Sequence, residues 1–155
     1  MENLPAIVTA AHALAAVVWV GGMFFAYVVL RPSLGFLEPP QRLTLWSAVF
    51  SRFFVWVWLA VAILLGTGYH MVFAELGGFD QAGLYILLMH GIALLMTALF
   101  AFLFFVPFPR FRAFVAAGDW PDAAGQLNLI RRIVATNLVL GLVNILVATS
   151  GRFWG

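Results

Sequence analysis

The chain contains four long stretches in which apolar residues follow one another without a single charged side chain. These stretches are 4–30, 53–74, 81–109 and 133–151. Each is long enough to supply the roughly 20 helical residues that cross the hydrocarbon core of a bilayer. Helices are expected because lipid offers the backbone no hydrogen-bond partners. The pattern predicts an all-α integral membrane protein, a four-helix up-down-up-down bundle that forms one domain over 1–155. Its spans are predicted at about 4–30, 51–74, 82–106 and 129–151.

Prolines punctuate the connections between the stretches, as turns between helices require. These prolines are Pro32, Pro39, Pro40, Pro107 and Pro109. Because no proline lies between Pro40 and Pro107, the second helix is expected to begin near Gln41 and to extend beyond the membrane. Pro107 and Pro109 are predicted to close the third helix. The sequence Asp-Trp-Pro-Asp at 119–122 predicts the start of the fourth helix.

The composition narrows the class of protein further. Of the 155 residues, 65% are apolar and 9% are charged, whereas a soluble domain is about half apolar and about a quarter charged. A soluble globule this small has too much surface to hide so many apolar side chains. A soluble enzyme, a disordered tail and a nucleic-acid module are therefore poor interpretations, and no nucleic-acid partner is expected. Cysteine is absent, which excludes disulfides, thiolate metal sites and thiol nucleophiles.

All eight positive charges are arginines, and their placement predicts the topology. With alternating spans, seven arginines lie at the end where the first and third helices stop, and Arg152 alone lies at the end that carries Met1. Arginine-rich short loops stay in the cytoplasm. The sequence therefore predicts a multi-pass protein of a bacterial inner (plasma) membrane with both termini on the periplasmic or outer side. This topology and attraction to anionic lipid account for the arginine cluster, and a ligand site there is the less favoured alternative.

The three histidines all fall inside the predicted spans, at His12, His70 and His90. Ionisable side chains are costly inside a membrane, so they are candidates for function. His12 and His90 lie on helices that run in the same direction, each on the order of 10 Å inside the outer boundary. His70 lies about 5 Å from that boundary. All three imidazoles are therefore expected in the outer half of the membrane.

His12 and His90 are the predicted cofactor and metal ligands. The first and third helices of such a bundle are diagonal neighbours. Two imidazoles at one depth that both point inward are placed to hold a haem b from opposite faces. Small or slim side chains share the helical face of each histidine, as a porphyrin would need: Ala15 and Ala16 beside His12, and Ala93 beside His90.

Four further residues are candidate cofactor contacts. Trp19 shares the face of His12, and Asn144 lies near the depth of the histidines on the fourth helix. His70 is expected beside the cofactor, near a haem propionate or on a proton path, rather than as an axial ligand. Arg152 is the cation at the outer end that is expected either to pair with a propionate or to extend to the interface.

Ordinary packing is the alternative for each of these residues. A histidine within a membrane helix often hydrogen-bonds a neighbouring helix, and small-residue faces are common where membrane helices pack closely. Asn137 and Asn144 are predicted to join helices rather than to contact a substrate. The tryptophans other than Trp19 are expected at interfaces or in packing, and the phenylalanine-rich stretch 100–105 is expected to face lipid.

The sequence resembles a known family over nearly its whole length. The stretch 12–25, followed by Leu-Arg-Pro at 30–32, resembles the first helix of the CopD-type copper-resistance membrane proteins. It is also similar to the first helix of the HemJ group, a membrane-bound protoporphyrinogen oxidase family. The run 50–68, which ends in Gly-Thr-Gly, resembles a CopD helix that ends in a Thr-Gly pair. The stretches 84–90 and 133–151 match the last two CopD helices in outline.

The resemblance implies two chemistries. CopD-like proteins imply copper handling, with copper passage across the inner membrane, and the HemJ group implies haem held by the first-helix histidine, which matches His12. His90 stands where both families commonly carry a lysine, and Asn137 stands where CopD tends to have an acid. The histidine weakens the case for HemJ-type catalysis and favours haem held by two histidines.

The leading hypothesis is a haem b-binding membrane redox protein. Haem iron with two histidine ligands has no open coordination position, so electron transfer is the expected chemistry. The protein could then be a membrane oxidoreductase. Besides the lipid bilayer, a quinone or a periplasmic redox protein is the expected partner. Assembly into a homo-oligomer remains an open alternative, and no catalytic residue is identified.

The alternative is a copper-binding or copper-transport protein that uses His12, His70, His90 and nearby methionines. Copper(I) favours cysteine and methionine ligands, but the chain has no cysteine and no methionine ladder across the membrane. A third hypothesis is a structural membrane subunit without a cofactor.

Overall fold

The computed structural model describes residues 3–154, apart from the side chain of Arg152. Four helical segments in it are long and apolar enough to cross a membrane. They are Leu4–Ser33, Pro39–Glu75, Leu84–Ala117 and Trp120–Ser150. No strand occurs among residues 3–154. The prediction of an all-α, four-helix membrane bundle is therefore confirmed.

The four segments are made of shorter helical elements. In chain order these are α1 (Leu4–Phe24), the π-helical η1 (Phe25–Leu30), α2 (Arg31–Ser33), α3 (Pro39–His70), the π-helical η2 (Met71–Glu75), the 3-10 turn η3 (Phe79–Gln81), α4 (Leu84–Phe105), α5 (Pro107–Ala117), α6 (Trp120–Ser150) and the 3-10 turn η4 (Gly151–Phe153).

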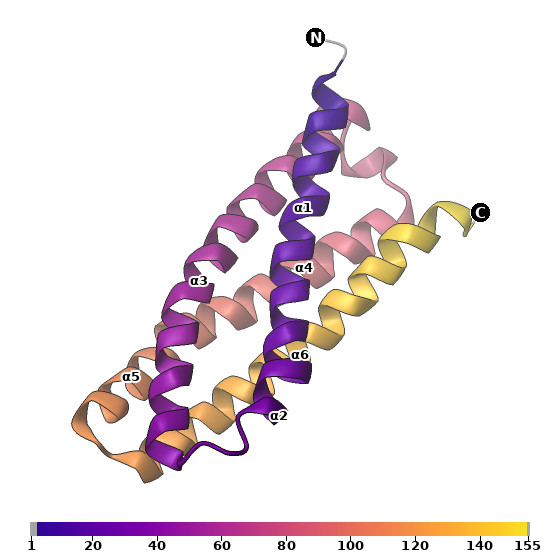
Figure 1. Cartoon of the computed structure of the whole chain (residues 1–155). Coiled ribbons are helices and arrows are strands. Elements are labelled where there is room, and N and C mark those ends of the chain that lie inside the picture. Colours follow the sequence, from indigo (N-terminus) through magenta and orange to yellow (C-terminus); the bar gives the residue numbers. More distant parts are fainter. Residues whose placement is uncertain (1–2, 155) are drawn as a thin grey trace.

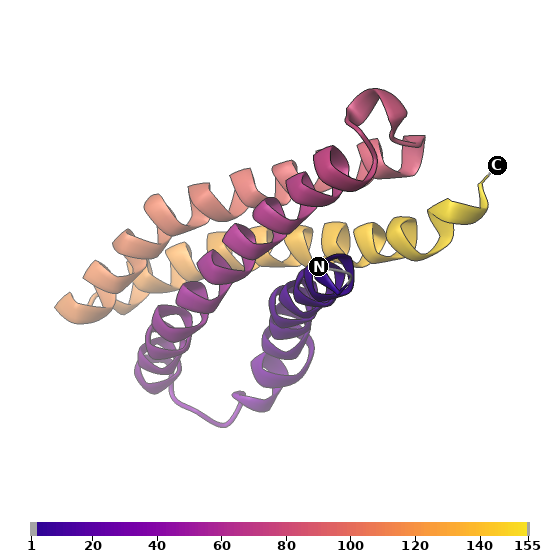
Figure 2. The same ribbon diagram turned by 90° about the horizontal axis from the view of Figure 1, so that it is seen from above.

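The bundle consists of two antiparallel pairs (Figures 1 and 2). The helix α1 packs most extensively on α3, while α4 and α5 pack on α6. The pairs meet where α6 contacts α1 and α3. The start of α1 and the end of α6 lie at the end of the bundle opposite α5 (Figure 1).

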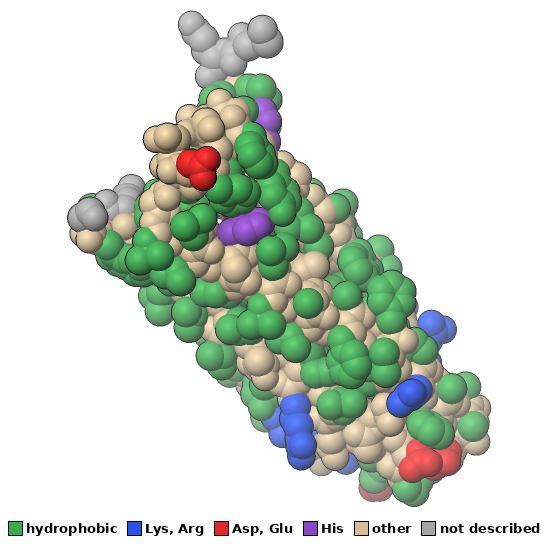
Figure 3. Space-filling view, turned by 180° about the vertical axis from the view of Figure 1, so that it is seen from behind, with side chains coloured by type: hydrophobic (Ala, Val, Ile, Leu, Met, Phe, Trp, Pro, Cys, Tyr) green, Lys and Arg blue, Asp and Glu red, His purple; other side chains and the backbone are tan. Residues whose placement is uncertain are grey.

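The two ends of the bundle differ in chemistry. We name the end formed by α2, the first turns of α3, and α5 the arginine end. The opposite end, which carries His12, His70 and His90, is the histidine end. On the face drawn in Figure 3, arginines lie near one end and histidines near the other.

Local capping explains where two helices begin. The side chain of Glu38 accepts from the backbone at the start of α3, and Gln41 Oε1 accepts from the Glu38 backbone N–H at 3.3 Å. The helix begins at Pro39, since a proline without an N–H suits the first turn. At α6, Asp119 accepts from the backbone N–H of Asp122 at 3.3 Å, so the predicted start of the fourth helix is confirmed.

The third segment bends at its prolines and does not end there. The helix α4 ends at Phe105, and α5 resumes at Pro107 because Val106 leaves the helical conformation with φ −114° and ψ −73°. Proline lacks a backbone N–H and clashes with the preceding turn, which breaks the hydrogen-bond ladder. The expectation that Pro107 and Pro109 close the third helix is therefore right for α4 only. The helix α5 then packs against α6 and ends at Gly118, whose φ of +73° favours glycine.

The expectation that 100–105 faces lipid is wrong for half of its helical surface. Phe100 is 3% exposed and Leu103 is 1% exposed, whereas Phe102 and Phe105 are exposed. Six consecutive residues cover the whole circumference of a helix with 3.6 residues per turn. Such a run in a packed helix therefore has residues on both the lipid-facing side and the core-facing side. The buried half of this stretch belongs to the protein core.

The fourth helix approaches its neighbours closely at Gly141. A Cβ placed there would lie 2.8 Å from Val20 Cγ2 and 3.2 Å from Met96 Cε. Glycine therefore lets α6 contact α1 and α4 at one level. One turn away, the buried Asn137 donates from Nδ2 to the backbone oxygen of Met96 at 3.1 Å. The prediction that Asn137 joins helices is confirmed.

Packing is looser at the histidine end. The last buried residue of α6 is Gly141 and the first of α4 is Met96, and on α3 the last is Val61. Beyond these positions, toward the histidine end, His12 and His90 are half-buried. Partly buried polar side chains are therefore gathered at an end where few residues besides Val72 and Gly151 are fully buried.

Candidate functional site

The imidazole of His12 lies on the face of α1 that meets α3. Its Nδ1 is 2.8 Å from Oγ1 of Thr67. The backbone of α3 passes close to the ring, since a Cβ placed on Gly68 would lie 3.5 Å from His12 Cε1. The segment at Thr67 and Gly68 therefore lies beside the imidazole and provides the hydroxyl that contacts it.

The hydrogen bonds of Thr67 determine which nitrogen of His12 carries the proton. A threonine hydroxyl has one hydrogen, and Oγ1 of Thr67 donates it to the backbone oxygen of Ile63 at 2.5 Å. A second, longer contact runs to the carbonyl of Leu64 at 3.4 Å. Because both carbonyls only accept, the hydroxyl oxygen has to accept from His12 Nδ1–H. The neutral imidazole then keeps its lone pair on Nε2, which is the form that binds a metal.

A thioether lies one turn further toward the histidine end. Oγ1 of Thr9 donates to Sδ of Met71 at 3.9 Å. Thr9 and His12 are three residues apart, and Thr67 and Met71 are four apart, so each pair shares one helical face. His12 on α1 and Met71, the first residue of η2, therefore lie on facing sides of the first two helical segments. Imidazole nitrogen and thioether sulfur are both ligands that copper accepts.

His90 lies in a different environment. Its Nε2 is 3.4 Å from the hydroxyl of Tyr69, and its ring centroid lies 5.2 Å from that of Tyr69 and 5.0 Å from that of Phe79. Tyr69 follows Thr67 by two residues, which is about 200° around a helix. His12 and His90 thus contact opposite sides of α3. The two rings contact different side chains of α3, and the haem hypothesis gains no support from the structure.

The other predicted site residues are dispersed. Trp19 is buried in the core and packs edge-on against Phe100, with ring centroids 6.1 Å apart. His70 is half-buried, and within residues 3–154 its ring has no hydrogen-bond partner. Asn144 is half-buried too, and its Oδ1 is enclosed without a partner among the described residues. The side chain of Arg152 lies outside the described part of the chain, so its predicted role stays a prediction.

The site is small. Among the residues that the structure describes, no group of three or more His, Cys, Asp or Glu side chains lies together. Any metal bound at the histidine end would therefore depend on imidazole and thioether ligands rather than on a cage of carboxylates.

Sequence reasoning found His12 but not its partners. Thr67 entered only through the Thr-Gly resemblance and Met71 only as a nearby methionine, since threonine and methionine are ordinary in membrane helices. One available signal was the spacing of Thr9 and His12 on one face and of Thr67 and Met71 on another. The sequence did not indicate that these two helical faces pack against each other.

The fold and the site define a multi-pass helical membrane protein with a histidine and a methionine on facing helices near one end. The family model of CopD, copper resistance protein D, matches residues 47–150. The chain belongs to the CopD family of copper-resistance membrane proteins, as the resemblance predicted. A search of curated proteins and a search of solved structures each returned no match.

The region matched by the family model, residues 47–150, contains Thr67 and Met71 but not His12. It covers most of α3 with Thr67, η2 with Met71, and α4, α5 and α6, and it leaves out α1 with His12. Copper handling is therefore the class of function to which the chain's family points, and the histidine that faces the family region comes from this chain's own first helix.

Proposed function

We propose that this protein binds copper(I) at the histidine end, with Nε2 of His12 and Sδ of Met71 as ligands. The observation that carries the proposal is the Thr67 hydroxyl, whose own hydrogen goes to Ile63 and which therefore leaves the Nε2 lone pair of His12 free. A hydrogen bond to the second ring nitrogen is the usual way in which a metal-binding histidine is oriented.

The donor set favours copper(I) over the other metals of its series. Thioether sulfur selects copper(I), and imidazole suits copper, whereas magnesium, calcium and manganese prefer oxygen ligands. Membership of the copper-resistance family supports the same ion. Haem is the weaker candidate because His90, the expected second axial ligand, lies against Tyr69 and Phe79 on the other side of α3.

The proposal includes an orientation in the membrane. Arginine-rich ends of membrane proteins stay in the cytoplasm, so the arginine end would face the cytoplasm of a bacterium and the copper site would lie near the outer face of the inner membrane. Copper(I) would then be met outside the cell interior, where a resistance protein first encounters it. No observation favours the quinone or periplasmic redox partner of the haem hypothesis, and neither belongs to the proposal.

Competition for copper(I) tests the proposal. Purified protein in detergent is titrated against a coloured copper(I) chelator under reducing conditions, and the loss of chelator colour reports binding. Wild-type protein is expected to withdraw one copper(I) per chain. His12→Ala is expected to abolish that binding, and Met71→Leu, which keeps the size of the side chain, is expected to weaken it at least about tenfold.

His90→Ala is the matched control, since it removes a half-buried histidine that contacts Tyr69 rather than Thr67, and it is expected to leave binding unchanged. Copper(I) withdrawal that is equal in wild type and His12→Ala would contradict the proposal. A Soret absorption band in the purified protein that disappears in both His12→Ala and His90→Ala would return the haem hypothesis to first place.

A further inference from the structure

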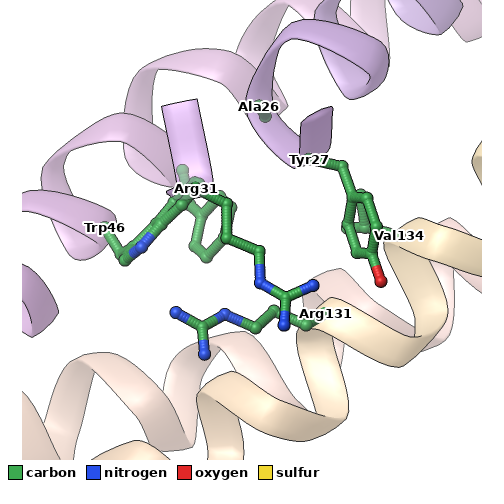
Figure 4. Close-up of a pocket in the computed structure, with 7 residues that line it drawn as sticks. Ala26, Tyr27, Arg31, Trp46, Arg131 and Val134 are labelled. Atoms are coloured by element: carbon green, nitrogen blue, oxygen red, sulfur yellow. The ribbon is translucent and has the colours of Figure 1, made fainter. Parts of the chain in front are cut away.

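The arginine end contains a hollow that the copper proposal does not use. It is narrow, with a volume of about 20 Å³, and it is partly open to the outside. The first segment, α3 and α6 each contribute to its wall (Figure 4). Its lining residues are Ala26, Tyr27, Arg31, Trp46, Phe50, Arg131 and Val134.

Two buried hydrogen-bond donors in this wall have no acceptor. Trp46 is 3% exposed, and its Nε1 is buried without a partner among the described residues. The Nε of Arg131 is likewise buried and unpartnered within residues 3–154. Both groups are N–H donors that cannot accept, and a buried donor left without an acceptor destabilises the folded protein. A ligand that satisfied both would have to be an acceptor.

The charge around the hollow has the same sign on every side. The positive charges of Arg31 and Arg42 both act on Arg131. In the described part of the chain, the polar contact of the Arg131 side chain is with a neutral group, Asn128 Oδ1 at 3.5 Å, and Arg31 lies over the Tyr27 ring at 4.9 Å. None of these three arginines forms an ion pair with a carboxylate among residues 3–154. Like charges gathered in a partly buried place repel one another unless an anion offsets them.

The side chains converge from different helices. Figure 4 shows Arg31 and Arg131 approaching from opposite ribbons, so that their guanidinium groups lie near each other, with the Trp46 ring beside them. Guanidinium groups match the geometry of phosphate oxygens through paired N–H donors. The hollow also lies where the first span ends, at the depth of lipid headgroups if the segment spans the bilayer.

We propose that this hollow binds a phosphate-type oxyanion, held by Arg31, Arg131 and the Nε1–H of Trp46. The same chemistry is offered by the phosphate of an anionic phospholipid headgroup and by free inorganic phosphate. The binding site is independent of copper, since it lies at the opposite end of the bundle from His12 and Met71.

The two sources are separated by two probes. In one arm, protein in detergent is mixed with phosphatidylglycerol, with phosphatidylcholine as the neutral comparison, and retained lipid is counted by native mass spectrometry. In the other arm, inorganic phosphate is titrated against the protein by calorimetry at constant ionic strength. Retained phosphatidylglycerol with no response to phosphate identifies a lipid site, and a response in both arms identifies a site for the phosphate group alone.

Three variants test the residues. Arg131→Gln and Trp46→Phe are expected to weaken binding at least about tenfold, since each removes a buried donor. Arg132→Gln is the charge-matched control, because Arg132 is the next residue on α6 and is exposed. The melting temperature of the wild type is expected to be higher in the presence of the probe than in its absence. This measurement does not depend on the variants.

Three outcomes would overturn the proposal. The first is that neither probe binds the wild type and neither raises its melting temperature. The second is that Arg132→Gln weakens binding as much as Arg131→Gln, which would show that net charge alone attracts the anion. The third is that Trp46→Phe folds and binds like the wild type.

Discussion

Nδ1 of His12 lies 2.8 Å from Oγ1 of Thr67, at a point where α1 and α3 face each other. The hydroxyl of Thr67 donates its hydrogen bond to the backbone oxygen of Ile63 in the preceding turn. The contact between Thr67 and His12 therefore fixes both the orientation and the tautomer of the imidazole ring. Nε2 is free because the Thr67 side chain donates to the backbone oxygen of the residue four positions earlier. The metal chemistry proposed for the histidine end depends on that hydrogen bond.

Thr67→Val is expected to lower copper(I) affinity about 10- to 100-fold, the usual effect of removing the group that orients a metal-binding histidine. Valine keeps the shape of the side chain and removes the acceptor for Nδ1–H. Affinity is measured by competition with the coloured chelator. Thr97→Val is the matched control, because Thr97 is also half-buried and donates to a backbone oxygen, that of Ala93 at 2.8 Å, without contacting a histidine. Equal affinities in the two variants would contradict the role of Thr67.

Gly141→Val is expected to destabilise the bundle by about 1–3 kcal/mol, the usual cost of inserting extra volume into a packed core. Its Cβ would meet Val20 at 2.8 Å and Met96 at 3.2 Å, so helix α6 would have to move away. Loss of helical circular dichroism on heating in detergent measures the effect. Gly21→Ala serves as the control, because a Cβ there meets nothing within 4 Å. A melting temperature for Gly141→Val equal to that of the control would show that α6 does not approach its neighbours as described.

Phe100→Ala is expected to destabilise the protein by about 3–5 kcal/mol, as truncation of a buried phenylalanine usually does. Phe100 packs against Phe54 and Trp58, with ring centroids 5.4 and 5.1 Å away. Phe102→Ala, at a position that is 48% exposed, is expected to change stability much less, since its ring lies on the outer surface of the bundle. The same heating experiment compares the two variants. Similar losses in both would support the lipid-facing interpretation of this stretch, which the structure contradicts.

Cysteine labelling tests the proposed orientation, and the chain provides a cysteine-free background. Asp80→Cys, in the turn η3 at the histidine end, is expected to react with a membrane-impermeant maleimide in intact cells. Ala117→Cys, at the end of α5 at the arginine end, is expected to react only after the membrane is permeabilised. The physical reason is the retention of arginine-rich loops in the cytoplasm. The reverse labelling pattern would place the histidine end inside the cell.

Much of the site was beyond the reach of sequence reasoning for a physical reason. Each membrane helix here is apolar nearly all the way round, so the pattern of residues does not say which face meets a neighbour. His12 and His90 were predicted to lie at one depth, and in the structure they contact different sides of α3, at Thr67 and at Tyr69. Equal depth was necessary for a shared iron, and it was not sufficient.

The residues that join the helices show the same limit. Asn137 was recognised as a polar side chain in a membrane helix, and such a side chain needs a partner. Its partner, the backbone oxygen of Met96, is 41 residues away in the chain and has no side-chain signature. The hollow at the arginine end likewise collects Arg31, Trp46 and Arg131 from three separate segments, so the sequence predicted the charge of this end and not the pocket.

By itself the amino-acid sequence determined the class of the protein, the number of its spans and the concentration of arginine at one end. The length and charge-free character of each stretch are set by the thickness and low polarity of the bilayer, and these act on each helix separately. The tertiary structure alone decided that His12 meets Thr67, that His90 turns to Tyr69, and that α6 closes on its neighbours at Gly141. Such pairings depend on how each helix is rotated about its axis, and that rotation is set by close packing between helices because the lipid treats their apolar faces alike.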